Sequence, residues 1–173
     1  MKTIRWVIAA ILFTGFAAGC SKEKSNEGNV YTLKMQFKPT ANGEPLLFDK
    51  SYLNLLGEDY KVSAFKFYVS NVTLLQDAGI EVAREQNGFH LIDASNPATL
   101  TLNIPLNGNR FSHIGFQVGI DSIRNVSGAQ TGALDPANGM FWTWNTGYIM
   151  AKLEGQSSFS NEVNQSLTYH IGG

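Results

Sequence analysis

The stretch VSAFKFYVSNVTLL, residues 62–75, decides the fold class. It is rich in β-branched and aromatic residues, which favour β-strands because their side chains pack well on a pleated surface. Its apolar positions do not follow the spacing of an amphipathic helix. We therefore expect one long or bent strand here, with the rest of the fold arranged around it.

Shorter strands are predicted on both sides of this stretch. Residues 31–37 (YTLKMQF) alternate between apolar and polar side chains, the pattern of a half-buried strand. A turn at residues 77–79 (DAG) closes a hairpin onto the next predicted strand. The further strands are residues 80–83, 89–93 (FHLID), 100–104, 111–120 and 167–171 (LTYHI), with an aromatic strand pair over residues 141–153.

Turn signals separate these strands. Asn42-Gly43 predicts a turn, Pro105 is expected to end the strand over residues 100–104, and residues 51–56 fit either a short strand or a helical turn. Residues 124–140 contain several glycines and little apolar mass, and we expect a long loop that is either ordered or disordered. Long loops in compact domains are often functional.

The pattern as a whole predicts an all-β fold, an antiparallel β-sandwich. No helical period persists over several turns, and no internal repeat is present. Gly172-Gly173 follows directly after a predicted strand, which suggests that the sandwich is incomplete at the C-terminus. We expect three segments: a signal peptide at residues 1–19, a lipidated cysteine with a flexible tether at 20–29, and the sandwich domain at 30–173.

The N-terminus predicts export as a lipoprotein of the cell envelope. Lys2 and Arg5 precede the apolar run WVIAAILFTGF, and small residues lead directly to Cys20, followed by the polar tether SKEKSNEGN. The apolar run is too short to remain as a transmembrane helix. The competing interpretation is an ordinary secretory signal beside an incidental cysteine. In the favoured one, acyl chains on Cys20 anchor the protein at the outer membrane or the periplasmic face.

Composition limits the function classes. Removal of the signal takes away Lys2 and Arg5 and leaves 11 basic against 14 acidic residues, a net charge of −3. This balance gives no basic surface for nucleic acid. Because lipidation uses Cys20, the only cysteine, no thiol remains for a disulfide, a metal site or a nucleophile. No catalytic motif is present either, so we expect no enzyme.

Two kinds of residue remain as site candidates. The histidines are His90, His113 and His170, none of them in a closely spaced metal motif, and a single histidine is more often structural than a ligand. Trp142 and Trp144 share a face if that segment is extended. Such a pair usually belongs to a core, or forms a carbohydrate platform when it is exposed.

Four motifs carry a resemblance to a known family. They are GALDPANGMFWTWNTGYIMAKLEG at residues 132–155, HLID at 90–93, GID at 119–121 and YHIGG at 169–173. Together they closely resemble the MbnP-like copper-binding family of secreted proteins and lipoproteins, named after a protein encoded beside methanobactin biosynthesis. The resemblance covers about residues 31–173, and chains of that family generally continue past the HIGG-like motif.

The resemblance implies a copper site in this chain. In the copper-binding relatives, histidines hold the metal beside a tryptophan oxidised to kynurenine. By motif, His90 and His170 are the implied ligands, and Trp142 or Trp144 is the implied modified residue. His113 matches no family motif. Two neutral imidazoles suit Cu(I), and a thioether is a further soft ligand, available from Met35, Met140 or Met150.

The leading hypothesis is therefore a non-catalytic envelope lipoprotein that binds copper, as Cu(I), for uptake, buffering or homeostasis. A copper transporter or an outer-membrane receptor would be its partner. The alternative is a β-sandwich surface or adhesion module that binds a glycan or a protein through its aromatic strand and long loop. A structural envelope lipoprotein without a small ligand is a third possibility. A shared copper site requires the imidazole nitrogens of His90 and His170 to lie within about 4 Å of each other, since each metal bond is ~2 Å long.

Overall fold

A computed structural model describes residues 30–107, 110–145 and 147–172. The predicted signal peptide, Cys20 and the tether lie outside these ranges. Within them, β-strands are joined by turns and by a single α-helical turn, α1 (Ser122–Asn125). No helix in the described ranges has the length and apolar character needed to cross a membrane.

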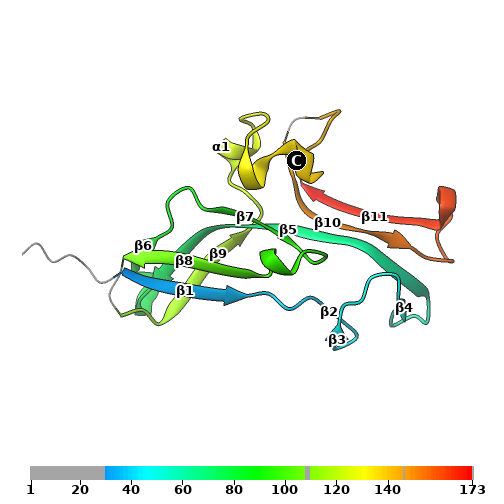
Figure 1. The fold of residues 1–173 in the computed structure, drawn as a ribbon, viewed down its shortest axis with the longest axis horizontal. Helices are drawn as coiled ribbons and strands as arrows, with labels where there is room; N and C mark the ends of the chain where they lie inside the picture. The colour runs from blue at the N-terminus through cyan, green and yellow to red at the C-terminus, as the bar shows by residue number, and fades with distance from the viewer. Residues whose placement is uncertain (1–29, 108–109, 146, 173) are drawn as a thin grey trace, which may run out of the picture.

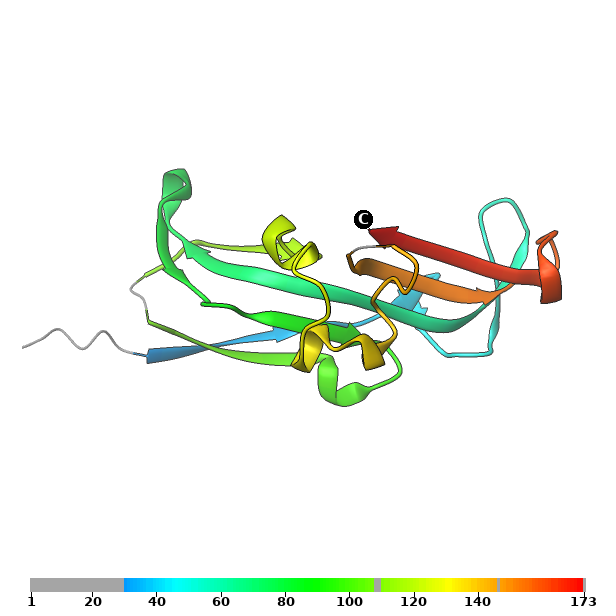
Figure 2. The ribbon, with the colours of Figure 1, turned by 90° about the horizontal axis from the view of Figure 1, so that it is seen from above.

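The long strand predicted from residues 62–75 is the centre of the fold. It forms β5 (Asp59–Leu75), which runs along most of the molecule in both ribbon views (Figures 1 and 2). A register shift between Ser70 and Thr73 bends it. Six strands pair with β5 or extend its sheet, all antiparallel: β4 (Ser51–Leu53), β6 (Glu81–Arg84), β7 (Phe89–Asp93), β9 (His113–Val118), β10 (Ile149–Gln156) and β11 (Ser166–Gly172).

A second, two-stranded sheet packs on one face of the first. It consists of β1 (Val30–Gln36) and β8 (Thr101–Asn107), paired antiparallel. The two sheets enclose a core of fully buried aliphatic residues: Val69, Val72, Leu74, Ile92, Ile104 and Leu106. We call the face of the large sheet that meets β1 and β8 the sandwich face. The predicted all-β antiparallel sandwich is confirmed.

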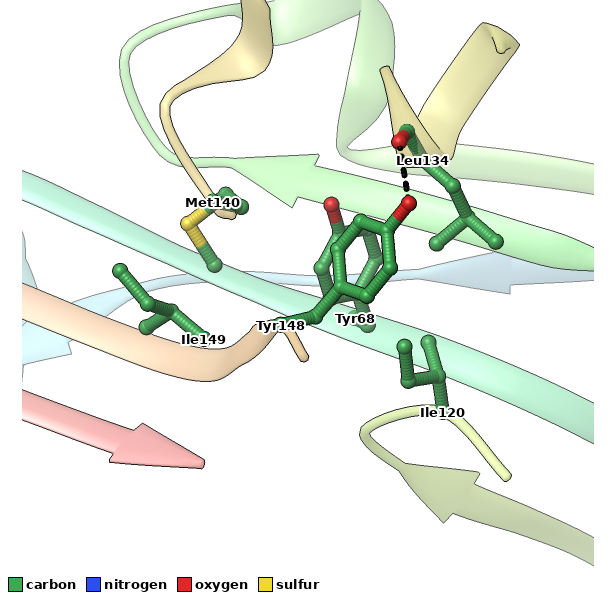
Figure 3. Close-up of a cluster of buried hydrophobic side chains, with 6 residues drawn as sticks. All are labelled: Tyr68, Ile120, Leu134, Met140, Tyr148 and Ile149. Atoms are coloured by element: carbon green, nitrogen blue, oxygen red, sulfur yellow. Dashed lines mark hydrogen bonds between the residues drawn. The ribbon is translucent and has the colours of Figure 1, made fainter. Parts of the chain in front are cut away.

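The opposite face of the large sheet, which we call the loop face, is covered by the connection between β9 and β10. This connection contains α1 and two 3₁₀ turns, Gly132–Leu134 and Pro136–Asn138. A second buried cluster lies beneath it: Tyr68, Ile120, Leu134, Met140, Tyr148 and Ile149 (Figure 3). The long loop predicted at residues 124–140 is thus an ordered cover with a core of its own.

Tyr148 connects the parts of this cover. Its side chain is fully buried. Its hydroxyl lies 2.9 Å from the carbonyl oxygen of Leu134 (Figure 3) and 3.1 Å from that of Gly128, and it accepts the backbone N–H of Gln130 at 3.1 Å. The Tyr68 hydroxyl donates to the carbonyl oxygen of Ala133 at 3.1 Å. Burial, together with the nearby Tyr148, raises the pKa of Tyr68 above its usual value, so its hydroxyl stays protonated and can donate.

Two sequence predictions need adjustment, and one open alternative is decided. Pro105 does not end its strand, because β8 continues to Asn107; β8 pairs only with β1, and a proline is tolerated in a strand with an unpaired edge. The aromatic strand pair over residues 141–153 is reduced to β10 and an isolated bridge between Phe141 and Tyr148. Residues 51–53 form the short strand β4, and a turn follows.

The turn at Asn42-Gly43 is confirmed between β2 (Thr40–Ala41) and β3 (Glu44–Pro45).

Candidate functional site

His170 lies on the loop face of the outermost strand pair. In β11 it is directly opposite Lys152 of β10, which is itself opposite Lys66 of β5. Residues paired directly across antiparallel strands point to the same face, so these three side chains form one row. The Nε2 atom of His170 is 2.7 Å from a carboxylate oxygen of Glu154. Since an ionised carboxylate only accepts hydrogen bonds, Nε2 carries the hydrogen of this contact, and Nδ1 is the lone-pair nitrogen when the ring is neutral.

Trp142 packs against His170. The two ring centroids are 5.5 Å apart, with the planes inclined by 57°. The indole N–H of Trp142 is buried and has no hydrogen-bond partner in the part of the chain that the structure describes. Such a donor costs free energy to bury, and in native structures an orphaned group of this kind calls for an explanation. Here this N–H belongs to the indole that contacts the imidazole of His170.

The Trp144 ring contacts that of Trp142 in a tilted arrangement. Its ring centroid is 5.0 Å from that of Trp142, with an angle of 60° between the planes, and 76% of the residue is exposed. The segment is not an extended strand, so the condition under which both indoles would share a face is not met. The structure brings Trp142 to His170 and leaves Trp144 on the outside.

The backbone that carries Trp142 is fixed from both sides. The N–H of Trp142 donates to the carbonyl oxygen of Gly147 at 3.1 Å, and the side-chain oxygen of Asn125 accepts the N–H of Tyr148 at 2.8 Å. Gly147 has a φ of +104°, and a Cβ there would meet the Asn125 amide at 2.8 Å, so only glycine fits. The Lys66 ammonium group donates to the carbonyl oxygen of Asn138 at 3.3 Å.

Charged pairs flank the site along the same row. Lys66 lies 3.0 Å from Asp93, and Lys152 lies 3.2 Å from Glu154. Burial raises the pKa of Glu154, but the hydrogen bonds from His170 and Lys152 outweigh it, and the pKa lies below its usual value. Burial likewise raises the pKa of Asp93, and the hydrogen bonds from Ser95 and Lys66 bring it below the usual value. Both carboxylates are therefore ionised at neutral pH.

His90 lies on the other side of the sheet. In β7 it is directly opposite Val69 of β5, while Asp93 is opposite Lys66 in the row of His170. His90 and Asp93 are three positions apart in the sequence, and an odd offset in a regular strand puts the two side chains on opposite faces. His90 therefore points to the sandwich face, as does Ile92, and its Nε2 lies 2.9 Å from a carboxylate oxygen of Glu85.

A metal site shared by His90 and His170 is therefore not formed in this structure. The backbone of the sheet separates their side chains, and each Nε2 is held by a different carboxylate. The sequence showed which neighbours share a face within each strand. It did not show how β7 and β11 are registered on β5, and that register decides the outcome.

The remaining candidates are also divided between the faces. His113, which matched no motif, is exposed, and its Nδ1 contacts the Ser112 hydroxyl at 2.9 Å. Met35 belongs to the sandwich core. Met140 is fully buried in the loop-face cluster, and Met150 packs against the same cluster, as Trp142 does. Met140 and Met150 are thus the two candidate thioethers on the side of His170.

Sequence reasoning missed the carboxylate that orients His170. Glu154 follows Lys152 by two residues and so shares its face, but only the β10–β11 register shows that His170 is opposite Lys152. If residues 149–156 and 166–172 had been paired as a hairpin, the alternation of Lys152 and Glu154 would have indicated that Glu154 lies on the same face as His170. No three His, Cys, Asp or Glu side chains gather as a metal-binding group within the described ranges.

The two layers of antiparallel strands define the class of the protein as an all-β sandwich. Its candidate site is the cluster of Trp142, Trp144 and His170, which lies outside the sandwich core, on the loop face. The chain belongs to the MbnP family, because the family model described as MbnP matches residues 30–173.

Comparison with solved structures gives the same fold. MbnP from Methylosinus trichosporium superimposes with a TM-score of 0.61 at 15% sequence identity, over 83% of this chain. The chain spans 62% of the length of that protein. No curated protein matches this sequence.

Proposed function

We propose that this protein is an envelope lipoprotein that binds copper, as Cu(I), at His170 beside Trp142. In this proposal it takes up or buffers the metal and catalyses no reaction. The lipid on Cys20 anchors it at the outer membrane or the periplasmic face, and a copper transporter or outer-membrane receptor is the partner that exchanges metal with it. Membership of the MbnP family supports the copper assignment, and the contact between His170 and Trp142 carries its location.

The residues around His170 suit copper better than zinc. Zinc sites in proteins use three or four nitrogen, sulfur or oxygen ligands, and the described residues offer no group of three His, Cys, Asp or Glu. Cu(I) tolerates fewer ligands and accepts imidazole and thioether donors. His170 supplies an imidazole whose second nitrogen donates to Glu154, the arrangement that fixes the tautomer and orientation of metal-binding histidines.

Trp142 is the tryptophan that we assign to this site. The resemblance left Trp142 and Trp144 as alternatives for the oxidised residue, and of the two it is the Trp142 ring that contacts His170. Its indole N–H has no hydrogen-bond partner among the described residues, and this supports the assignment because no structural hydrogen bond to them occupies the ring. Bound copper would supply a redox-active centre next to this ring. His170 would hold the metal, and Glu154 would hold His170.

Anaerobic Cu(I) titration against a competing chelator tests the proposal. We expect tight binding of one Cu(I), at least 100-fold weaker binding in His170→Ala, and a change of less than 3-fold in His90→Ala, which alters the same residue type on the other face. Unchanged binding in His170→Ala would contradict the proposed site. Intact mass and peptide mapping check Trp142, since conversion to kynurenine adds a small fixed mass.

The anchor has its own test. Wild-type protein expressed with labelled palmitate should incorporate the label and fractionate with membranes, because each buried CH₂ of an acyl chain contributes about 0.8 kcal/mol. Cys20→Ser should do neither. Equal labelling of both proteins would contradict lipidation at Cys20.

One observation favours the alternative of a glycan-binding module: 76% of Trp144 is exposed. Sugar rings stack on flat aromatic faces, and the 60° angle between Trp142 and Trp144 leaves a platform of one indole. Trp144→Ala separates the two functions. Loss of binding on a glycan array with unchanged Cu(I) affinity would support the module, and unchanged binding of any glycan would exclude Trp144 as its platform.

A further inference from the structure

A pocket of about 450 Å³ opens at the loop-face cover, and its lining differs from the residues that contact His170. Its lining comes from the turn before β7 and the first residue of β7, from α1, and from the first 3₁₀ turn of the cover with the two residues before it. The residues are Asn87, Phe89, Arg124, Gln130, Thr131, Ala133 and Leu134. His170, Glu154 and Trp142 are not among them. The volume is in the range of small-molecule sites.

The guanidinium group of Arg124 is held in a fixed place in this pocket. It packs over the ring of Phe89, with its central carbon 5.7 Å from the ring centroid. One terminal nitrogen donates to the side-chain oxygen of Gln130 at 3.3 Å, and the other donates to that of Asn87 at 3.1 Å. The Gln130 amide is itself fixed, because its NH₂ group donates to the Arg124 carbonyl oxygen at 2.9 Å. A guanidinium group has five N–H donors, so several remain for a ligand.

No carboxylate neutralises Arg124 within the described ranges. Ion pairs there engage Arg84 with Glu81, Lys66 with Asp93, and Lys152 with Glu154, and the two histidine–carboxylate contacts are His90 with Glu85 and His170 with Glu154. None of them includes Arg124. Asp121 is close in sequence, but its carboxylate accepts the backbone N–H of Arg124 at 2.9 Å and so caps α1. The other lining residues are all uncharged, so Arg124 alone gives the described pocket a formal charge, which is positive.

We propose that this pocket binds a small organic anion through a carboxylate. The guanidinium fork matches a carboxylate in geometry and charge, and a partly desolvated pocket strengthens this pairing relative to water. Phe89, Ala133 and Leu134 form an apolar wall next to the charge, which suits the carbon frame of such a ligand better than a bare inorganic ion. The site is separate from the proposed copper site, so either one can fail without the other.

Benzoate is the probe, and benzamide is its uncharged isostere. In ¹H–¹⁵N NMR spectra of the wild-type protein at physiological salt, we expect benzoate to shift the Arg124 Nε–H signal and the amides of Gln130 and Thr131 saturably. Benzamide should bind at least 10-fold more weakly, and this comparison needs no variant. Absence of saturable shifts at these residues, or equal binding of the two probes, would overturn the proposal.

Variants sharpen the test. Arg124→Gln keeps hydrogen bonding and removes the charge, and we expect benzoate affinity to fall at least 10-fold. Arg124→Lys should keep part of it, and His170→Ala should bind benzoate as the wild type does. If sulfate binds the pocket as tightly as benzoate does, the pocket is a general anion site, and the proposal of an organic ligand is overturned. Wild-type benzoate affinity in a folded Arg124→Gln protein would also overturn it.

Discussion

His170 and His90 have the same local chemistry and different surroundings. Each lies on an antiparallel strand, and each has its Nε2 within 3 Å of a glutamate oxygen, Glu154 for His170 and Glu85 for His90. His90 points to the sandwich face, where aliphatic residues fill the core. His170 points to the loop face and contacts the indole of Trp142. An imidazole–carboxylate pair therefore does not mark a metal site by itself; the face of the sheet and the aromatic neighbour distinguish the two.

The largest expected effect is a loss of stability when the buried core beneath the loop-face cover is disrupted. Tyr148→Ala removes a fully buried ring whose hydroxyl joins three backbone segments, so we expect a loss of about 3–5 kcal/mol in the free energy of unfolding. Urea unfolding measures it. Copper binding at His170 should be lost with the cover, because Trp142 is held by the same segment.

Tyr148→Phe is the milder control. It keeps the ring and leaves the partners of the hydroxyl unsatisfied, which costs roughly 1–3 kcal/mol. A loss below 1 kcal/mol in Tyr148→Ala would contradict the view that the cover has a packed core of its own.

We expect an intermediate effect on Cu(I) affinity from replacing Glu154, and little effect from replacing Glu85. Glu154→Gln removes the group that orients His170, and loss of such an outer partner typically weakens metal binding 10–100-fold. Glu85→Gln makes the same change beside His90 and should leave Cu(I) affinity within 3-fold of the wild type. The chelator competition assay measures both. If the two variants weaken Cu(I) binding equally, the proposal that only the loop face, at His170, binds copper is contradicted.

The smallest effect concerns pH. The pKa of Glu154 in the folded protein lies below its usual value of 4.5, so its ionised form stabilises the fold above about pH 4.5, and this contribution is lost as the pH falls through the folded pKa. Between pH 7 and pH ~3, the wild type should lose more stability than Glu154→Gln. Urea unfolding at the two pH values checks this. A larger acid-induced loss in Glu154→Gln would reverse the sign and contradict the assigned interaction.

The sequence predicted most of the strands but not their registry. Alternation of apolar and polar side chains located β1, and β-branched and aromatic residues located β5, β7 and β11. Which strand lies against which, and in what register, depends on contacts distant in the chain. That is why the sequence left Trp142 and Trp144 as alternatives beside His170, and why His90 was expected on the same side as His170 and lies on the other.

The loop face was the hardest part to predict. Residues 124–140 have little apolar content, and the core beneath them is completed by Tyr68 from β5 and by Tyr148 and Ile149 from the start of β10. Glu154 and Arg124 acquire their roles from partners that no local pattern indicates, namely His170 across a hairpin and Phe89 on another strand.

Long-range ¹H–¹⁵N NMR of the imidazole nitrogens during anaerobic Cu(I) titration tests the central claim most directly. The account predicts that the Nδ1 signal of His170 shifts with one equivalent of Cu(I), while both nitrogens of His90 keep their positions. Shifts of the His90 nitrogens equal to those of His170, or no shift of His170 at one equivalent, would contradict it.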